Sequence, residues 1–261
     1  MGMEPILEVC NLQKNFSGKK AGITLLQDIS FSVMPGECVG IVGQSGSGKS
    51  TLANVVSGLL PANGGSVKLC GQEILYGNAK SLKQAYLYMQ MIFQQPYDSF
   101  DPRKTIGWSI GEGLKNQGIG RSPLKVEIKR LLDVVGLTES IKERYPHEIS
   151  GGECQRAAIA RSLALKPVFL ICDEITSALD ASTQLKIVEL IQSLCTRLNI
   201  ACLFISHDLS LVKRLSQRIL VLHEGVIVES GLTKTVLQSP SSLWTKKLIS
   251  AESFFKEAVL T

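Results

Sequence analysis

The chain has 261 residues, which is enough for one or two domains with a large core. Hydrophobic residues make up 44% of it and charged residues 20%, a balance that excludes a disordered chain. The 28 Lys and Arg residues exceed the 23 Asp and Glu residues by a net charge of +5, but they are spread along the chain, so we expect no nucleic-acid partner. No apolar run approaches the roughly 18 residues needed to cross a bilayer, and the first residues lack the pattern of a secretory signal.

The first third of the chain is predicted to be rich in strands, because short apolar or alternating runs are separated by Gly and Pro. These strands are expected at 6–9, 27–33, 37–42 and 66–70, with one helix at 49–60. The middle of the chain, 81–165, is more polar and is predicted to be helical, with an amphipathic helix at 124–135.

The last third alternates strands with helices. Strands are predicted at 168–172 and 201–205, helices at 184–198 and 209–215, a hairpin at 218–222 and 226–229, and a helical tail at 232–261. The run at 168–172 is continuously apolar, which is typical of a strand buried on both faces of a parallel sheet. This order of elements predicts an α/β fold with the helical middle as an inserted subdomain.

One segment fits the phosphate-loop pattern G-x-x-x-x-G-K-[ST], between a predicted strand and a predicted helix. Its residues are Gly43, Gln44, Ser45, Gly46, Ser47, Gly48, Lys49, Ser50 and Thr51. Glycines let several backbone N–H groups point at one anion, and the following helix adds its positive end. We expect Lys49 to reach the β- and γ-phosphates of a nucleoside triphosphate and Ser50 to bind Mg²⁺.

Two carboxylates, Asp173 and Glu174, end the apolar strand at 168–172. Because ligands of a parallel sheet lie at the carboxyl ends of its strands, Asp173 is predicted to face the same crevice as Lys49 and to hold Mg²⁺. Glu174 points elsewhere and is a candidate for polarising the attacking water. Alone, such a pair is also compatible with a solvated strand end; the phosphate loop favours the functional interpretation.

Further segments resemble the motifs of ATP-binding cassette (ABC) ATPases over essentially the whole chain. Residues 149–156, Ile-Ser-Gly-Gly-Glu-Cys-Gln-Arg before a helix at 157–165, resemble the signature motif, and 177–180, Ser-Ala-Leu-Asp, resemble the D-loop. His207, in Ser-His-Asp after the strand at 201–205, resembles the H-loop histidine, and Gln94 the Q-loop glutamine. Phe16 stands where the family places an aromatic residue that stacks on adenine.

This resemblance implies a P-loop NTPase (RecA-like) core with a parallel sheet, an antiparallel β subdomain and an inserted α-helical subdomain. It implies a nucleotide-binding domain at 1–235, with the helical subdomain at about 95–165, and a short helical extension at 236–261. The family pairs two cassettes around two ATP molecules, so the phosphate loop of one faces the signature of the other.

By the resemblance, each motif has a role in ATP hydrolysis. Ser150, Gly151 and Gly152 start a helix and would present a hydroxyl, N–H groups and a helix N-terminus to a partner's γ-phosphate. Glu174, His207 and Gln94 are the catalytic candidates, although His207 is also compatible with a structural role. The remaining candidates are Asp180 for nucleotide binding, and Gln94 beside Ser50 and Asp173 for Mg²⁺.

Three positions depart from the common family pattern. Ile149 and Glu153 replace the commoner Leu and Gln of the signature, and Ile175 stands where many members have Pro. Glu153 adds a negative charge near a site that receives phosphate. This predicts a weaker composite site at this signature and leaves open whether both sites of a dimer hydrolyse equally.

Two segments resemble ATPases of dipeptide, oligopeptide and nickel importers. They are 97–105, Tyr-Asp-Ser-Phe-Asp-Pro-Arg-Lys-Thr, and 239–248, Ser-Pro-Ser-Ser-Leu-Trp-Thr-Lys-Lys-Leu. The short end after these residues, without a cysteine cluster, is more similar to the second ATPase of nickel-type systems. The function implied is ATP hydrolysis that powers import of peptides or nickel and other metal chelates.

The implied partners are a second ATPase, the same or different, two integral membrane permeases and, indirectly, an extracytoplasmic solute-binding protein. The helical middle would carry a groove for a short permease helix; Ile106, Trp108 and Ile110 either line it or belong to the core, and we favour the core. The expected location is the cytoplasmic face of a bacterial plasma membrane, in agreement with seven scattered cysteines that form no Cys-x-x-Cys pair.

Two alternatives remain. A soluble mechanochemical cassette of DNA repair or ribosome-associated type would carry a long coiled coil or two cassettes in one chain, and neither is present in these residues. A partner cassette that binds ATP but hydrolyses it weakly is opposed by the presence of both Glu174 and His207, while Glu153 leaves room for it.

Overall fold

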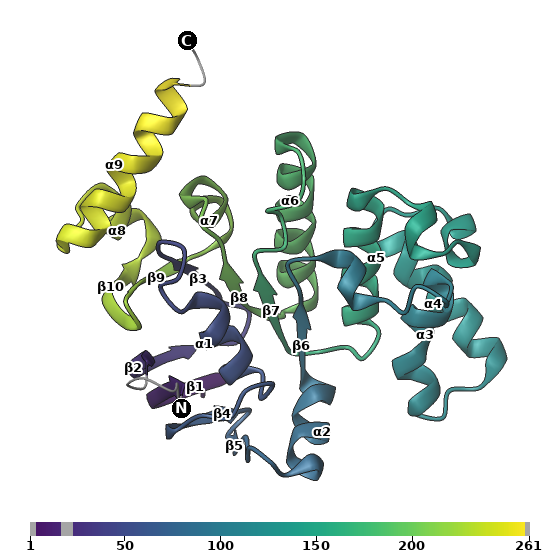
Figure 1. The fold of residues 1–261 in the computed structure, drawn as a ribbon. Helices are drawn as coiled ribbons and strands as arrows, with labels where there is room; N and C mark the ends of the chain where they lie inside the picture. Colours follow the sequence, from purple (N-terminus) through teal and green to yellow (C-terminus); the bar gives the residue numbers. More distant parts are fainter. Residues whose placement is uncertain (1–3, 17–22, 259–261) are drawn as a thin grey trace.

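The computed structural model of the chain describes residues 4–16 and 23–258; residues 16, 23–24 and 252–258 are described by their backbone alone. Two sheets and several groups of helices make up the molecule (Figure 1). Within the described ranges, no helix is long and apolar enough to cross a membrane.

The larger sheet has six strands in the order β10-β9-β3-β8-β7-β6. Five of them run parallel, and β10 pairs antiparallel with β9 at one edge. The bounds are β3 (Cys38–Val42), β6 (Met89–Ile92), β7 (Phe169–Asp173), β8 (Ala201–Ile205), β9 (Arg218–His223) and β10 (Val226–Leu232). Every residue of β3, β7 and β8 is buried, which confirms the predicted central strands.

The smaller sheet is antiparallel, with the order β2-β1-β4-β5. Its strands are β1 (Leu7–Phe16), β2 (Ile23–Val33), β4 (Gly64–Leu69) and β5 (Gln72–Glu73). The predicted α/β fold with a parallel sheet, an antiparallel sheet and helical segments is therefore confirmed.

Most helices lie in the connections between these strands, and α8 and α9 follow the last strand, β10. They are α1 (Lys49–Val56), α2 (Ala79–Tyr88), α3 (Ile106–Asn116), α4 (Arg121–Val134), α5 (Gly151–Leu163), α6 (Ala181–Leu198), α7 (Leu209–Leu215), α8 (Thr233–Gln238) and α9 (Leu243–Ala258), with 3₁₀ turns η1 (Pro96–Ser99), η2 (Glu139–Glu143) and η3 (Pro146–Glu148). Figure 1 shows α3, α4 and α5 gathered at the β6 side of the large sheet, and α9 projecting from the other side.

Side chains of the central strands alternate between two hydrophobic cores, one on each face of the large sheet. Phe169 and Ile171 of β7 join the core that includes α1 and the antiparallel sheet. Leu170 and Cys172 join the core formed with α3 to α7. Burial on both faces holds the strand ends rigidly, and those ends carry the candidate site.

Three expectations need correction. Residues 89–92, within the segment predicted to be helical, form strand β6, because their backbone pairs with β7 in register Met89↔Phe169. Helix α1 ends at Val56 instead of residue 60, since Gly58 takes the left-handed φ of 79°. Residue 232 belongs to β10, so the helical tail begins at Thr233.

The two interpretations of the residues on α3 are resolved in favour of the core for two of them. Ile106 and Ile110 are fully buried. Trp108 is half-buried, with the ammonium groups of Lys104 and Lys115 at 5.1 and 5.0 Å from its ring centroid.

Candidate functional site

The phosphate loop, residues 43–51, connects the buried strand β3 to helix α1. Gly48, the residue before α1, has a φ of 104°, and a Cβ there would lie 2.8 Å from the carbonyl oxygen of Leu25. The Lys49 ammonium donates hydrogen bonds to the carbonyl oxygens of Gly43 and Gln44, at 2.9 and 3.0 Å. The loop therefore curls around its own lysine, as a phosphate-binding loop requires.

Buried polar groups of this loop fit an anionic ligand. Burial lowers the pKa of Lys49, while Glu174 and Asp173 act in the opposite direction. The Ser47 hydroxyl is buried and has no hydrogen-bond partner among the described residues. A phosphate would give both groups an acceptor. Gln44, Ser45 and Gly46 form the exposed outer part of the loop, and Thr51 follows on α1.

Asp173 and Ser50 lie together although 123 positions separate them. The Ser50 hydroxyl donates to Asp173 Oδ1 over 3.2 Å. Asp173 ends β7 and is 7% exposed. Burial raises its pKa, and the hydrogen bond from Ser50 and the charge of Lys49 only partly offset this effect. Two oxygen atoms beside a phosphate site are ligands of the type that Mg²⁺ takes, so these residues fit that ion.

Glu174, Gln94 and His207 converge because each follows one of three neighbouring parallel strands, β7, β6 and β8. The Gln94 amide donates to Glu174 Oε2 over 3.1 Å. His207 Nδ1 lies 3.9 Å from Glu174 Oε1. The side chain of Glu174 is 18% exposed and that of His207 62%, so the cluster opens to solvent. It can therefore hold and polarise a water molecule.

The backbone of Glu174 is unusual. Its φ is 47°, a left-handed conformation that costs a non-glycine residue about 1–3 kcal/mol. Its N–H donates to the carbonyl oxygen of Ile205 over 3.0 Å, which ties the residue to the end of β8. Such strain is typical of functional positions.

Ser177 also belongs to this cluster, and this role was not predicted from the sequence. Its hydroxyl accepts from the Gln94 amide over 3.2 Å and donates to the Glu174 carbonyl oxygen over 3.0 Å. Its place in the D-loop segment was visible in the sequence, but the contact with Gln94 depends on the pairing of β6 with β7.

The signature segment starts helix α5 and carries a capping box. The Ser150 hydroxyl accepts from the N–H of Glu153 over 3.3 Å. Glu153 Oε2 in turn accepts from the N–H and the hydroxyl of Ser150, over 2.9 and 2.8 Å. These hydrogen bonds lower the pKa of Glu153. The unusual glutamate thus completes the start of this helix.

The signature lies next to the start of α6, where Asp180 acts as the N-cap. A Cβ on Gly152 would contact the Thr183 methyl group at 3.0 Å, and one on Gly151 would contact Leu179 at 3.7 Å. Asp180 accepts from Ser182 and Thr183, and these hydrogen bonds lower its pKa well below the ordinary value.

The chain does not bring its own signature to its own phosphate loop. Figure 1 places α5 and α1 on opposite sides of β6 and β7.

Phe16 is the remaining residue of the predicted site. It ends β1, where its backbone pairs with Ile23, and its side chain lies outside the described part of the structure.

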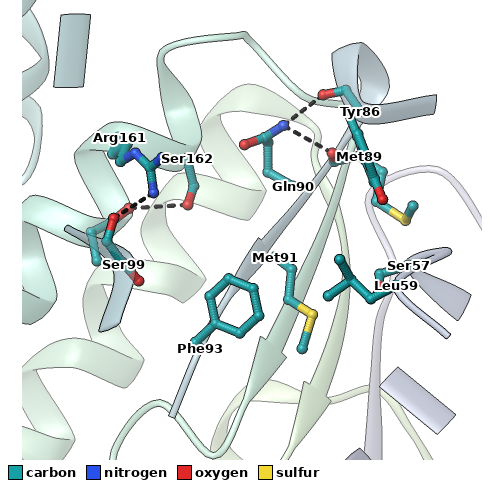
Figure 2. A pocket seen from close by; sticks show the side chains of 11 residues that line it. Ser57, Leu59, Tyr86, Met89, Gln90, Met91, Phe93, Ser99, Arg161 and Ser162 are labelled. Carbon is teal, nitrogen blue, oxygen red and sulfur yellow. Dashed lines mark hydrogen bonds between the residues drawn. The ribbon is translucent and has the colours of Figure 1, made fainter. Parts of the chain in front are cut away.

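A cleft of about 340 Å³ lies beside β6. Leu59, Met91 and Phe93 form its apolar side, and Ser99, Arg161 and Ser162 form its polar side (Figure 2). Leu59 and Phe93 are 48% and 37% exposed. Ile106, Trp108 and Ile110 are not among its lining residues, in agreement with the favoured interpretation of Ile106 and Ile110 as core residues.

Comparisons with known proteins agree with this geometry. The model of the family described as ABC transporter matches residues 26–177. A putative peptide import ATP-binding protein of Brucella ovis is 39% identical over 248 residues, which cover 95% of this chain and 78% of the relative. The glutathione import ATP-binding protein GsiA of Salmonella typhi is 42% identical over 256 residues, which cover 95% of this chain and 41% of GsiA.

Solved structures with this fold include a dimeric ATP-binding cassette in a post-hydrolysis state, bound to ADP and Pi. It has a TM-score of 0.80 and 26% identity, and the match covers 87% of this chain and 98% of that one. CbiO1 of Clostridium perfringens, part of an ABC transporter complex, has a TM-score of 0.80 and 26% identity, covering 90% of this chain and 91% of its own.

Proposed function

We propose, since this chain belongs to the ABC transporter family, that its ATP hydrolysis powers a membrane importer and that the imported solute is a peptide. The chain is an ATP-binding protein and an ATPase of that family. The observation that carries the proposal is the convergence of Lys49, Asp173, Glu174, Gln94 and His207 at one edge of the parallel sheet.

In the proposed mechanism, the phosphate loop binds the triphosphate through its backbone N–H groups and Lys49. Glu174 accepts a hydrogen bond from the attacking water, oriented by Gln94 and His207 on either side of its carboxylate. We propose that Ser50, Asp173 and Gln94 are the ligands of Mg²⁺, which would neutralise charge on the phosphates when bound. We also propose that the ring of Phe16 stacks on the adenine of ATP.

A second cassette is proposed to complete each ATP site. Ser150, Gly151 and Gly152 lie at the N-terminus of α5, where N–H groups suit a γ-phosphate. Helix α5 lies on the opposite side of β6 and β7 from α1, which follows the phosphate loop of the same chain. ATP then favours a closed dimer, and hydrolysis removes the bridging phosphate and lets it open. The partner is the same chain or a different ATPase.

The cleft beside β6 is the proposed seat of a short helix from a permease. Phe93 lines this cleft, and the next residue in the chain, Gln94, belongs to the catalytic cluster. A displacement of Gln94 when the bound nucleotide changes would therefore also move Phe93. The apolar side suits an apolar helix face. We propose two permeases, a solute-binding protein outside the membrane, and a position on the cytoplasmic face of a bacterial plasma membrane.

A peptide is the preferred solute because the Brucella relative is named for peptide import and GsiA for glutathione, itself a peptide. Nickel and other metal chelates remain the alternative. Either solute would be selected by the other subunits, so a binding assay on the solute-binding protein from the same transporter separates the two.

The test is Glu174→Gln, with Glu73→Gln on β5 as the matched control away from the site. We expect Glu174→Gln to lower ATP turnover by about 10²-fold or more while ATP binding persists, and an ATP-bridged dimer to accumulate in size-exclusion chromatography. The control keeps normal turnover. Unchanged turnover in Glu174→Gln would contradict the assigned role, and association with ribosomes or DNA in place of membrane subunits would contradict the importer.

A further inference from the structure

The turn between β9 and β10 is bonded directly to the phosphate loop. The N–H of Gly225 donates to the carbonyl oxygen of Ser47 over 3.0 Å, and the Gly225 carbonyl oxygen accepts from the N–H of Gln27 over 2.8 Å. Gly225 has a φ of 77°, and a Cβ there would clash with the carbonyl oxygen of Leu25. The turn therefore sits between β2 and the phosphate loop without free space.

The end of β9 approaches the loop at a second point. A Cβ on Gly43, the first residue of the loop, would clash with the carbonyl oxygen of Leu222. Residues 222–225 thus contact the loop at its beginning and in its middle. A shift of this segment has to move the loop, because closely packed backbones cannot absorb the displacement.

His223 lies within residues 222–225, and its ring contacts Trp244, a residue of another element. The ring stacks on Trp244, with a centroid separation of 3.6 Å and an interplanar angle of 23°. Its Nε2 is buried and has no hydrogen-bond partner among the described residues; Glu224 Oε1 lies 3.9 Å away on a side chain that is 86% exposed. The stack on Trp244 is therefore a contact that orients the ring where Nε2 has no hydrogen bond among the described residues.

Trp244 belongs to the first turn of α9, which is firmly attached. The Glu229 carboxylate of β10 accepts from the N–H groups of Ser241 and Ser242, over 2.8 and 3.0 Å, and from the Ser241 hydroxyl over 2.9 Å. The Lys247 ammonium lies 4.3 Å from the Trp244 ring centroid. The indole is thus held on a helix whose start is bonded to the same hairpin.

We propose that Trp244 is a positioning residue for the phosphate loop: through its stack on His223, helix α9 holds residues 222–225 against the loop and so sets the affinity for ATP. This inference rests on the proposed ATPase function. Without the indole, the buried Nε2 of His223 can turn towards water, and the segment loses one of the contacts that keep it in place, in addition to its backbone hydrogen bonds. A stacked pair of this kind supports an effect of about 2- to 10-fold on the dissociation constant for ATP.

The experiment measures ATP binding by calorimetry on the full chain, with Trp244→Ala, Trp244→Phe and, as matched control, Leu243→Ala. Leu243 is the neighbouring residue on α9 and is 63% exposed. We expect Trp244→Ala to raise the dissociation constant and KM for ATP about 2- to 10-fold with kcat at saturating ATP unchanged. Trp244→Phe restores most of the affinity, and the control behaves like the unaltered protein.

A spectroscopic readout separates positioning from a purely structural role. The chain has two tryptophans, so Trp108→Phe leaves Trp244 as the sole indole emitter. ATP should change its fluorescence in this background, and adding His223→Ala should remove the change. A lowered Tm for Trp244→Ala with an unchanged ATP affinity would overturn the proposal, as would fluorescence indifferent to ATP. If the unaltered protein bound no ATP, the proposed function would fall together with this inference.

Discussion

Glu153→Gln should separate the structural role of this glutamate from its effect on the phosphate site. Glu153 Oε2 accepts two hydrogen bonds from Ser150, at 2.9 and 2.8 Å, and lies in the first turn of α5. A hydrogen bond to a charged acceptor contributes about 1.5–3 kcal/mol and one to a neutral acceptor about 0.5–1.5 kcal/mol. The lost interaction with the helix dipole adds about 0.3–1 kcal/mol.

Both hydrogen bonds lie at the exposed start of α5, where water competes with them, so only part of this sum is realised. The free energy of unfolding should fall by about 1–2 kcal/mol, which lowers Tm by about 2–8 °C in a chain of this size. Calorimetry at pH 7 measures this, with Glu189→Gln, whose carboxylate pairs with Arg214 on the surface, as control. Because the folded-state pKa of Glu153 is lowered, its contribution is present above the ordinary pKa of 4.5 and is lost as pH falls through the lowered value. The two melting curves should converge in acid.

The same substitution should also strengthen the composite ATP site. In the Glu174→Gln background, which is expected to trap the dimer, Glu153→Gln should shift dimer formation to lower ATP concentrations because a negative charge near the γ-phosphate is removed. An unchanged Tm would refute the argument from the capping box. An unchanged ATP requirement would refute the argument from charge.

Three further substitutions test other parts of the structure. Lys49→Ala removes a charged donor from the loop and should weaken ATP binding about 10- to 100-fold by calorimetry; normal affinity would contradict the assignment of the loop. Gly43→Ala places a Cβ against the Leu222 carbonyl and 2.7 Å from the Ser47 hydroxyl, so the loop must shift and kcat/KM should fall about 10²-fold in a steady-state assay. Burial would raise the pKa of Glu229, but hydrogen bonds that start with those from Ser241 lower it to about 2. Glu229→Gln should therefore lower Tm at pH 7 and remove the share of the acid loss of stability that Glu229 contributes between about pH 4.5 and 2.

The central strands and the phosphate loop could be predicted because their signals are local. The run at 168–172 is apolar throughout, and the loop has its glycines and its lysine at fixed spacing. Because ligands of a parallel sheet lie at the carboxyl ends of its strands, Asp173 and Glu174 could also be placed at that edge of the sheet. These inferences required no knowledge of distant contacts.

Strand β6 could not be predicted, since its four residues have no local signal strong enough to separate them from a polar helical region. Its conformation is decided by pairing with β7, some 80 residues later. The same dependence hid Ser177, whose contact with Gln94 exists only once β6 is in the sheet. The stack of His223 on Trp244 could not be predicted either, because the two residues belong to different elements and no periodic pattern in the sequence relates their positions.

The two edge strands of the large sheet have a consequence for aggregation. At one border β6 offers only four residues, and at the other β10 packs against α8 and α9. Unpaired strand edges recruit strands from neighbouring molecules, and short or covered edges do so poorly. The two edges of the large sheet are therefore poor templates for cross-molecular strand pairing, which limits aggregation through this sheet.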